Sequence, residues 1–263
     1  MSYWLLVLLG LLCIPLAHKM YTHSAVQSSH TPANHSIQHL GVIMDGNRRW
    51  ASQKNLARSW GYRHGTNTLR TLVRYCLEHS IKIVSVYAFS MENFKRDPSE
   101  IEDVFKLFVE EANKSLPELI EQKVTVRFLG DKNIFPQSIL PTLKKVEERT
   151  ADGSHLQLNV LFCYSGRQEI ISAIKTIVQD IQEKKITEVP DEEGFKKYLW
   201  TKNIPDPDLI IRTGGCKRLS NFMPYQATYS ELYFVDNLWP DLTTHDLDAA
   251  LNEYTKRTRT FGI

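Results

Sequence analysis

The feature of this sequence that most restricts its fold is a set of short apolar runs that stop abruptly at charged or flexible residues. The first run covers residues 40–44, LGVIM. It is shorter than a typical helix and partly β-branched, so it predicts a buried strand of an α/β sheet. Ligands of such sheets bind at the carboxyl ends of the strands. The residues that follow this run are Asp45, Gly46, Asn47, Arg48 and Arg49.

These five residues combine properties that suit a metal-bound anion. Asp45 offers a hard oxygen ligand for Mg²⁺, and Gly46 allows close approach of the backbone. Asn47 tolerates a left-handed turn, while Arg48 and Arg49 present planar guanidinium groups to phosphate oxygens. The alternative is an ordinary surface turn with solvated charges. The apolar run before the segment and two similar clusters elsewhere favour a binding site.

Two later apolar runs, 209–211 and 86–89, end in the same way. A Gly-Gly pair, cations and a hydroxyl follow the run 209–211, and all of them suit an anion. The charged and hydroxyl residues there are Arg212, Lys217, Arg218 and Ser220. Polar and basic residues up to Arg96 follow the run 86–89. Neither the Walker pattern nor the dinucleotide fingerprint occurs, so the three strand ends predict a different kind of anion site.

These three segments, with residues 229–234 (YSELYF) and 239–241 (WPD), resemble the cis-prenyltransferases, the undecaprenyl and dehydrodolichyl diphosphate synthases. The resemblance covers about residues 37–262. It implies an enzyme that condenses isopentenyl diphosphate with an allylic diphosphate primer, such as farnesyl diphosphate, in the cis configuration. The implied product is a polyprenyl diphosphate for a lipid glycan carrier. The implied fold is a single α/β domain with a mostly parallel central sheet flanked by helices and an apolar product tunnel.

The resemblance also implies roles for individual residues. Asp45 matches an aspartate essential for Mg²⁺ and diphosphate, Glu231 a second metal-associated carboxylate, and Asn93 a position that assists proton removal. The implied contacts of the allylic diphosphate are Gly46, Asn47, Arg48, Arg49, Arg58 and Arg96. The implied contacts of isopentenyl diphosphate are Arg212, Arg218 and Ser220. The other residues expected near the substrates are Trp50, Ser90, Met91, Glu92, Phe94 and Leu219.

Two positions depart from the pattern of the family. Tyr62 stands where the family usually has histidine, and a phenol does not carry protons at neutral pH as imidazole does. Thr260 stands where the family has the arginine of an Arg-x-Gly tail, which reaches a neighbouring active site in homodimers or comes from a partner chain. We expect a homodimer, because Arg257 and Arg259 keep the local charge. The alternatives are a catalytic subunit that needs an Arg-x-Gly-supplying partner, or a non-catalytic scaffold subunit of the same fold.

Composition agrees with an ordinary globular enzyme. The chain has 263 residues, of which 42% are hydrophobic and 24% charged, enough for one substantial core. A net charge of +2 is too small to indicate nucleic-acid binding. The 4 cysteines form no Cys-x-x-Cys pair, so neither a zinc site nor a disulfide framework is predicted.

The sequence divides into an apolar segment 1–21, a polar linker 22–36 and a catalytic domain 37–263. Residues 3–17 would span about 22 Å as a helix, less than the ~30 Å of a bilayer core, so they predict a marginal membrane anchor. We expect the domain at the cytoplasmic face of a membrane, or in the cytoplasm. Periodicity predicts helices at 65–79, 99–114, 136–150, 168–184 and 246–258, and further strands at 83–89, 124–130, 156–164 and 232–235.

Overall fold

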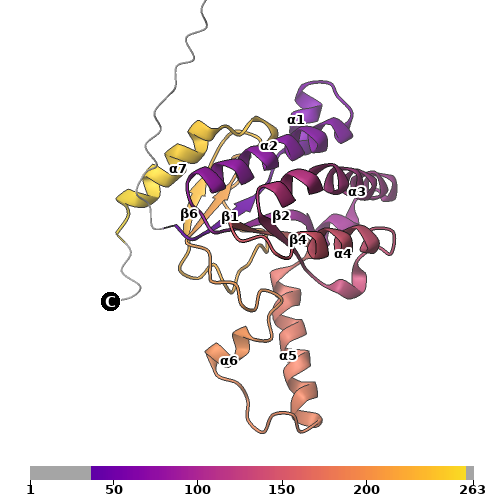
Figure 1. The fold of residues 1–263 in the computed structure, drawn as a ribbon, viewed down its shortest axis with the longest axis vertical. Helices are drawn as coiled ribbons and strands as arrows, with labels where there is room; N and C mark the ends of the chain where they lie inside the picture. The colour runs from indigo at the N-terminus through magenta and orange to yellow at the C-terminus, as the bar shows by residue number, and fades with distance from the viewer. Residues whose placement is uncertain (1–36, 259–263) are drawn as a thin grey trace, which may run out of the picture. The chain divides into compact units, whose positions relative to one another are not determined.

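A six-stranded sheet lies at the centre of the computed structural model, which describes residues 37–258 (Figure 1). Its strands in spatial order are β3, β4, β2, β1, β5 and β6. Every pairing is parallel, so the predicted mostly parallel sheet is confirmed and all carboxyl ends share one edge. The strands are β1 (His39–Ile43), β2 (Ile83–Ser90), β3 (Val124–Leu129), β4 (Leu156–Tyr164), β5 (Leu209–Arg212) and β6 (Glu231–Phe234).

The apolar runs form strands because both faces of the sheet are covered. All residues of β1 and β5 are buried, as expected for a parallel sheet between two layers. Successive side chains face opposite layers. Leu40 and Val42 therefore belong to one core cluster, whereas Ile43 and Ile210 belong to the other.

The first core lies between the sheet and α2, α3, α4 and α7, and the second lies beneath the segment 200–227. The main helices are α2 (Arg58–Glu78), α3 (Pro98–Glu121), α4 (Leu140–Arg149), α5 (Gly166–Gln182) and α7 (Thr244–Lys256). All five predicted helices are confirmed. Shorter elements that the periodicity did not predict are α1 (Asn47–Gln53), α6 (Glu192–Lys196) and the 3₁₀ helices η1 (Met91–Lys95), η2 (Lys132–Ile134) and η3 (Trp239–Asp241).

Helix α2 begins at Arg58, well before the predicted start at residue 65. Gly61 and Gly65 lie inside it, and glycine ordinarily weakens a helix. Here the glycines let α1 pack against α2: a Cβ on Gly61 would lie 2.1 Å from the Asn47 carbonyl oxygen, and one on Gly65 would lie 2.3 Å from the Asn47 Oδ1. Close packing, rather than a break in the helix, therefore explains this pair of glycines.

The predicted apolar segment 1–21 and linker 22–36 lie outside the described residues. Within residues 37–258, no helix combines the length and the hydrophobicity that crossing a bilayer requires.

A buried polar row crosses the amino-terminal half of the sheet. His39 is fully buried, with its Nε2 2.7 Å from the Ser85 hydroxyl and its Nδ1 2.6 Å from the Pro205 carbonyl oxygen. Asn159 donates to the same hydroxyl at 3.1 Å. Burial lowers the pKa of His39 to about 4 from its ordinary 6.5, although the Pro205 carbonyl oxygen and Asp208 oppose the shift. Neutral His39 therefore joins β1 to β2.

We predict that acid weakens the fold through His39. Its folded pKa lies below its unfolded value, so the contribution of His39 is fully present above pH 6.5 and is lost as the pH falls towards 4. The loss is about 3 kcal/mol in the free energy of unfolding. Urea unfolding at pH 7 and pH 4.5 measures it, and in His39→Gln this part of the pH dependence should disappear. His155→Gln, at an exposed histidine, should keep the full dependence.

Candidate functional site

The segments that carry the predicted site meet at the carboxyl edge of the sheet. β1 lies between β2 and β5. The next strand in the sequence, β2, lies on one side of β1, and β5, which comes much later in the sequence, lies on the other side. Such a reversal of strand order leaves a crevice where α/β proteins bind ligands. Asp45 lies just beyond β1, and Arg212 ends β5 beside it.

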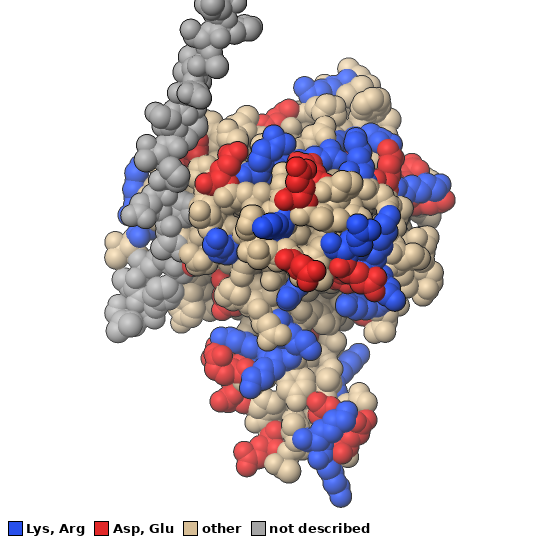
Figure 2. Space-filling model, in the orientation of Figure 1, with Lys and Arg blue, Asp and Glu red and all other residues tan. Residues whose placement is uncertain are grey.

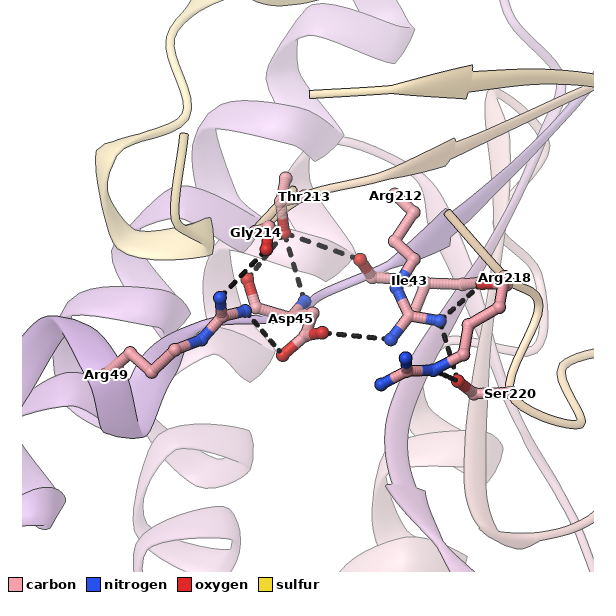
Figure 3. Close-up of polar contacts among 8 residues, drawn as sticks. All are labelled: Ile43, Asp45, Arg49, Arg212, Thr213, Gly214, Arg218 and Ser220. Atoms are coloured by element: carbon pink, nitrogen blue, oxygen red, sulfur yellow. Dashed lines mark hydrogen bonds and ion pairs between the residues drawn. The ribbon is translucent and has the colours of Figure 1, made fainter. Parts of the chain in front are cut away.

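Asp45 is held between two arginines (Figure 3). Its Oδ2 lies 2.9 Å from the Arg212 Nη2, and its Oδ1 lies 3.3 Å from the Arg49 Nη2. The Asp45 side chain is 31% exposed, so its carboxylate is reachable from solvent. The predicted proximity of these three residues is thus present in the structure, although 167 positions separate Asp45 from Arg212 in the sequence.

Arg212 is buried and links β5 to the loop that follows it. Its Nη1 donates to the Ser220 hydroxyl at 2.7 Å and to the Arg218 carbonyl oxygen. The Arg218 Nε donates to the same hydroxyl at 3.1 Å. The Nε of Arg212 is buried and has no hydrogen-bond partner. A buried donor without an acceptor is costly, so this group could donate a hydrogen bond to an oxygen of a bound anion.

Thr213 and Gly214 belong to the site; the Gly-Gly pair was noted in the sequence as suited to an anion, whereas Thr213 was not predicted. The Thr213 hydroxyl donates to the Asp45 carbonyl oxygen at 2.7 Å and accepts from the Asp45 N–H at 3.0 Å (Figure 3). The Arg49 Nη1 donates to the Gly214 carbonyl oxygen at 2.9 Å. Gly214 has φ +82°, and a Cβ there would lie 2.3 Å from the Arg49 Nη2. A glycine at position 214 is therefore required for Arg49 to bind there.

A second basic cluster surrounds the buried carboxylate of Glu100, in the first turn of α3. The Arg58 Nη1 donates to its Oε2, the Tyr62 hydroxyl donates to its Oε1 at 3.0 Å, and the Arg48 Nε lies 3.5 Å from that oxygen. The Arg96 Nη1 lies 3.7 Å away. The Glu100 carboxylate is therefore surrounded by four hydrogen-bond donors. The three arginines among them were predicted contacts of the allylic diphosphate. Glu100 itself was not predicted.

Tyr62, the departure from the family pattern, takes part in this cluster. Its hydroxyl accepts from the Arg96 Nη1 at 3.0 Å while donating to Glu100. Burial raises the pKa of Tyr62 to about 12, although the Arg96 cation opposes the shift. Tyr62 is therefore an uncharged hydrogen-bonding group throughout the neutral range, and it fixes the direction of Arg96.

Three cavities meet at the side chains of Met44, Asn47 and Tyr62. The first, of about 620 Å³, is lined by Asp45 and the cations Arg48, Arg49, Arg58 and Arg96. The second, of about 840 Å³, is lined by Asp45, Ser90, Asn93, Arg96, Arg212, Arg218 and Ser220. The third, of about 180 Å³, is mainly apolar and runs between the sheet and helices α2 and α3. Two cation-rich pockets therefore share Asp45, and an apolar cavity leads away from their junction.

Asn47 lines all three cavities, and its Oδ1 is buried without a hydrogen-bond partner. Arg167, three residues beyond the end of β4 and in the first turn of α5, also lines the second cavity. Arg167 was not predicted, although a basic residue near a fourth predicted strand end was a signal of the kind used for the other three.

The 3₁₀ helix η1 and Ser90 before it lie at the rim of the second cavity. Ser90, Glu92 and Asn93 line it. The Asn93 Oδ1 accepts from the Ser90 N–H at 3.1 Å, and the Glu92 Oε1 accepts from the Asn221 Nδ2 at 3.0 Å. Met91 is not among the residues that line the described cavities.

Three apolar side chains expected near the substrates lie outside the two cation-rich cavities. Trp50 is buried behind the site, where its indole donates to the Asp241 Oδ1 at 2.7 Å, because a buried indole N–H needs an acceptor. Leu219 packs against the second core cluster. Phe94 is 38% exposed and has its ring 5.1 Å from that of Phe89. None of the three lines the two cation-rich cavities, and their expected contact with the substrates stays a prediction.

Glu231 lies at the opposite edge of the sheet from Asp45. It begins β6 and pairs with Leu209, which in turn pairs with Leu40 near the start of β1. Its carboxylate accepts from the Arg257 Nη1 at 2.7 Å. Within one chain, Glu231 therefore does not complete a metal site with Asp45.

The residues present fit Mg²⁺ only as part of a diphosphate complex. Among residues 37–258 no group of three or more His, Cys, Asp and Glu side chains could hold a metal. Asp45 provides one accessible carboxylate amid cations. Mg²⁺ is often held by one or two carboxylates together with phosphate oxygens and water. Asp45 with a bound diphosphate fits that pattern.

The comparisons with known proteins agree with this geometry. The chain belongs to the prenyltransferase family whose profile, described as "Putative undecaprenyl diphosphate synthase", matches residues 43–262. The members are enzymes that transfer prenyl groups. The resemblance inferred from the three strand ends is thereby confirmed.

Relatives and solved structures extend the match. An isoprenyl transferase of Thermotoga maritima is 43% identical over 225 residues, covering 86% of this chain and 96% of its own length. A tritrans,polycis-undecaprenyl-diphosphate synthase (geranylgeranyl-diphosphate specific) of Pyrococcus abyssi is 41% identical over 86% of each chain. The lavandulyl diphosphate synthase of Lavandula x intermedia, solved with dimethylallyl diphosphate, superposes with a TM-score of 0.83 at 28% identity, covering 86% of this chain and 98% of that one.

We predict that Tyr62→Phe weakens the affinity for inorganic pyrophosphate about five- to tenfold, because Arg96 loses a hydrogen bond that fixes it. Isothermal titration calorimetry measures the change. Tyr75→Phe is the matched control, since Tyr75 lies on the same helix and donates to Asp248 at 2.7 Å, away from the cavities. Equal affinities in Tyr62→Phe and the unsubstituted chain would contradict the role of the hydroxyl.

Proposed function

We propose that this chain condenses isopentenyl diphosphate with an allylic diphosphate in the cis configuration and repeats the step to make a polyprenyl diphosphate. The observation that carries the proposal is the arrangement of the cavities. Two cation-rich pockets share Asp45, and a mainly apolar cavity opens at their junction. Two diphosphates and one growing hydrocarbon need an arrangement of this kind.

The allylic diphosphate is assigned to the pocket with Arg48, Arg49 and Arg58, and isopentenyl diphosphate to the pocket with Arg212, Arg218 and Ser220. Both pockets reach Met44, Asn47 and Tyr62, where the apolar cavity begins. A prenyl tail can therefore enter the apolar cavity while its diphosphate stays among the cations. The unpaired Arg212 Nε and Asn47 Oδ1 are polar groups that bound substrate could satisfy.

The chemistry needs stabilisation of the departing diphosphate. Breaking the allylic carbon–oxygen bond places negative charge on the diphosphate, and fixed cations stabilise that charge without rearranging. Asp45, together with the diphosphate, would hold Mg²⁺, which would supply further positive charge there. The new carbon–carbon bond forms between the allylic carbon and isopentenyl diphosphate, which then loses a proton. Asn93 lines the second pocket, which supports its proposed part in that proton loss.

We propose that the apolar cavity is the beginning of the product tunnel. Val104, Leu107 and Phe108 of α3 line it. These side chains have the helical spacing of a core stripe, and they belong to the cavity as well. An apolar enclosure excludes water from the allylic cation, which water would otherwise capture.

We propose that two copies of the chain associate through α5. This helix carries an outward apolar stripe in which Ile171, Ile174, Val178 and Ile181 are 45%, 46%, 47% and 37% exposed. Their spacing of three to four residues places them on one face. An apolar stripe of this length is typical of an interface. Thr260, which raised the alternative of a partner-supplied arginine, lies outside the described residues.

Membrane association is part of the proposal. It rests on the apolar residues 3–17, which lie outside the described residues, and on the apolar product. A polyprenyl diphosphate must enter a bilayer to carry glycans, so an enzyme at the cytoplasmic face of a membrane would deliver it directly.

We predict that the purified full-length chain, given farnesyl diphosphate, labelled isopentenyl diphosphate and Mg²⁺, makes polyprenyl products. Asp45→Asn should lower turnover by about 100-fold or more, because the carboxylate that holds Mg²⁺ and orients Arg212 is lost. Radiolabel incorporation and product chain-length analysis measure both results. Asp103→Asn, at an exposed position of α3, is the control and should keep its activity.

The same assay distinguishes a self-sufficient enzyme from a subunit that needs a partner chain and from a non-catalytic scaffold subunit. Products that appear only when a second chain with an Arg-x-Gly tail is added would make this chain one subunit of a two-chain enzyme. A failure to make product under both conditions would overturn the proposed activity and favour a scaffold subunit.

We predict that Ile174→Glu combined with Val178→Glu converts the proposed dimer to a monomer, because two carboxylates would be buried without partners. Light scattering after size exclusion measures the mass. Ile120→Glu changes a residue on α3 with a similar exposure of 37%, so it should leave the dimer intact. A doubly substituted protein that stays dimeric would place the interface elsewhere.

A further inference from the structure

A ladder of ion pairs joins α2 to α3, which together form one wall of the apolar cavity. The two helices run in the same direction, and three arginines of α2 face three glutamates of α3. The pairs are Arg63–Glu110 at 2.8 Å, Arg70–Glu111 at 2.7 Å and Arg74–Glu118 at 4.0 Å. Figure 2 shows basic and acidic side chains next to each other over the region where Figure 1 places these helices.

The middle pair differs from the outer two. Arg63, Glu110, Arg74 and Glu118 have side chains that are 41% to 59% exposed, and such pairs contribute little. The Glu111 side chain is 10% exposed and that of Arg70 20%. The Arg70 Nη2 also donates to the Ser115 hydroxyl at 3.1 Å. We call this partly buried group of Arg70, Glu111 and Ser115 the clasp.

The clasp lies at the apolar cavity. Glu111 and Ser115 line it together with apolar residues of the sheet. A charge so placed is costly unless it is paired, and among the described residues the cations within 4.0 Å of Glu111 are Arg63, Arg70 and Lys114. Glu111 therefore needs Arg70 to stay beside it, and this requirement holds α3 against α2.

The cavity must widen for a polyprenyl chain. Its volume is about 180 Å³, whereas an apolar cavity of about 150 Å³ accommodates one benzene ring. The cavity is also lined by residues of β2, β3 and β4 and of α2, and α2 buries seven residues and packs on α1 and η3. Only two apolar side chains of α3 are buried, Leu107 and Leu116, and seven more pack against the core while partly exposed. The apolar contacts of α3 are thus more exposed than those of α2, so α3 is the wall that can move.

Pro117 adds a second weak point close to the clasp. It lies inside α3, two residues beyond Ser115, and it cannot donate the backbone hydrogen bond that continues the helix. The end of α3 beyond the clasp is therefore held less firmly by its own backbone.

We propose that the clasp limits how far α3 can move from α2, and that it thereby sets the length of the product. Arg70, Glu111 and Ser115 are then specificity-determining residues that touch neither diphosphate. The inference rests on the proposed function, because it concerns the product of that reaction. Loosening the clasp lets the cavity take a longer chain before elongation stops.

The test compares Glu111→Gln with Glu110→Gln in the full-length chain. Both substitutions remove one negative charge from neighbouring positions of α3, but only the first affects the clasp. In Glu111→Gln we expect the product distribution to shift by one or more isoprene units towards longer chains, with a smaller shift in Ser115→Ala. Glu110→Gln should give the unsubstituted distribution.

Hydrogen–deuterium exchange of the same proteins without substrate gives a second measurement. In Glu111→Gln we expect the amides of residues 104–119 to exchange several-fold faster, with those of β1 and β2 unchanged. Unchanged exchange, or an unchanged product distribution, would overturn the clasp while leaving the proposed activity intact. Absence of product from the unsubstituted chain would instead overturn the proposed function and, with it, the role in product length.

Discussion

The buried guanidinium group of Arg212 is the group on which the site depends. Only 4% of this residue is exposed, and a buried cation needs an anion and further acceptors around it. Asp45 supplies the anion, and Ser220 and the Arg218 carbonyl oxygen supply the acceptors. Because Arg212 ends β5 and Asp45 follows β1, this pairing joins the two sides of the point where the strand order reverses. The crevice there is charged and ordered before any substrate arrives.

The Glu100 carboxylate orders the cations of the first pocket, as Asp45 orders Arg212. Four donors that suit a diphosphate would repel or lose order if nothing held them, and the buried Glu100 carboxylate provides a local anion. A bound diphosphate carries more negative charge than one carboxylate and can share the same donors. The arginines are thus preorganised for an anion, and preorganised charge is what stabilises a departing diphosphate. Tyr62 serves this arrangement through hydrogen bonding and needs no protonation change.

The sequence predicted the strands, the long helices and most of the polar site because each depends on local pattern. An apolar run followed by Asp45 or Arg212 identifies a strand end without knowledge of distant residues. Residues whose role comes from packing could not be found in that way. Glu100 appears in sequence as an ordinary acid of a first helical turn, and Thr213 as a small polar residue. The positions of Trp50 and Glu231 could not be predicted for the opposite reason, since matching a motif does not say which way a side chain faces or at which end of a strand it lies.

One charge pattern links the diphosphate pocket to the apolar cavity. Between Gly46 and Leu77 the chain has 7 arginines and lysines and no acidic residue, and helix α3 supplies the matching carboxylates. Glu100 pairs with this basic stretch beside the first pocket, and Glu111 pairs with it beside the cavity. The two carboxylates lie about 16 Å apart along the helix axis. They are two of the four buried residues of α3, so ion pairing holds this helix together with the apolar packing of its other residues. The same helix therefore carries one carboxylate that orients the cations of the first pocket and a second carboxylate that holds the wall of the apolar cavity.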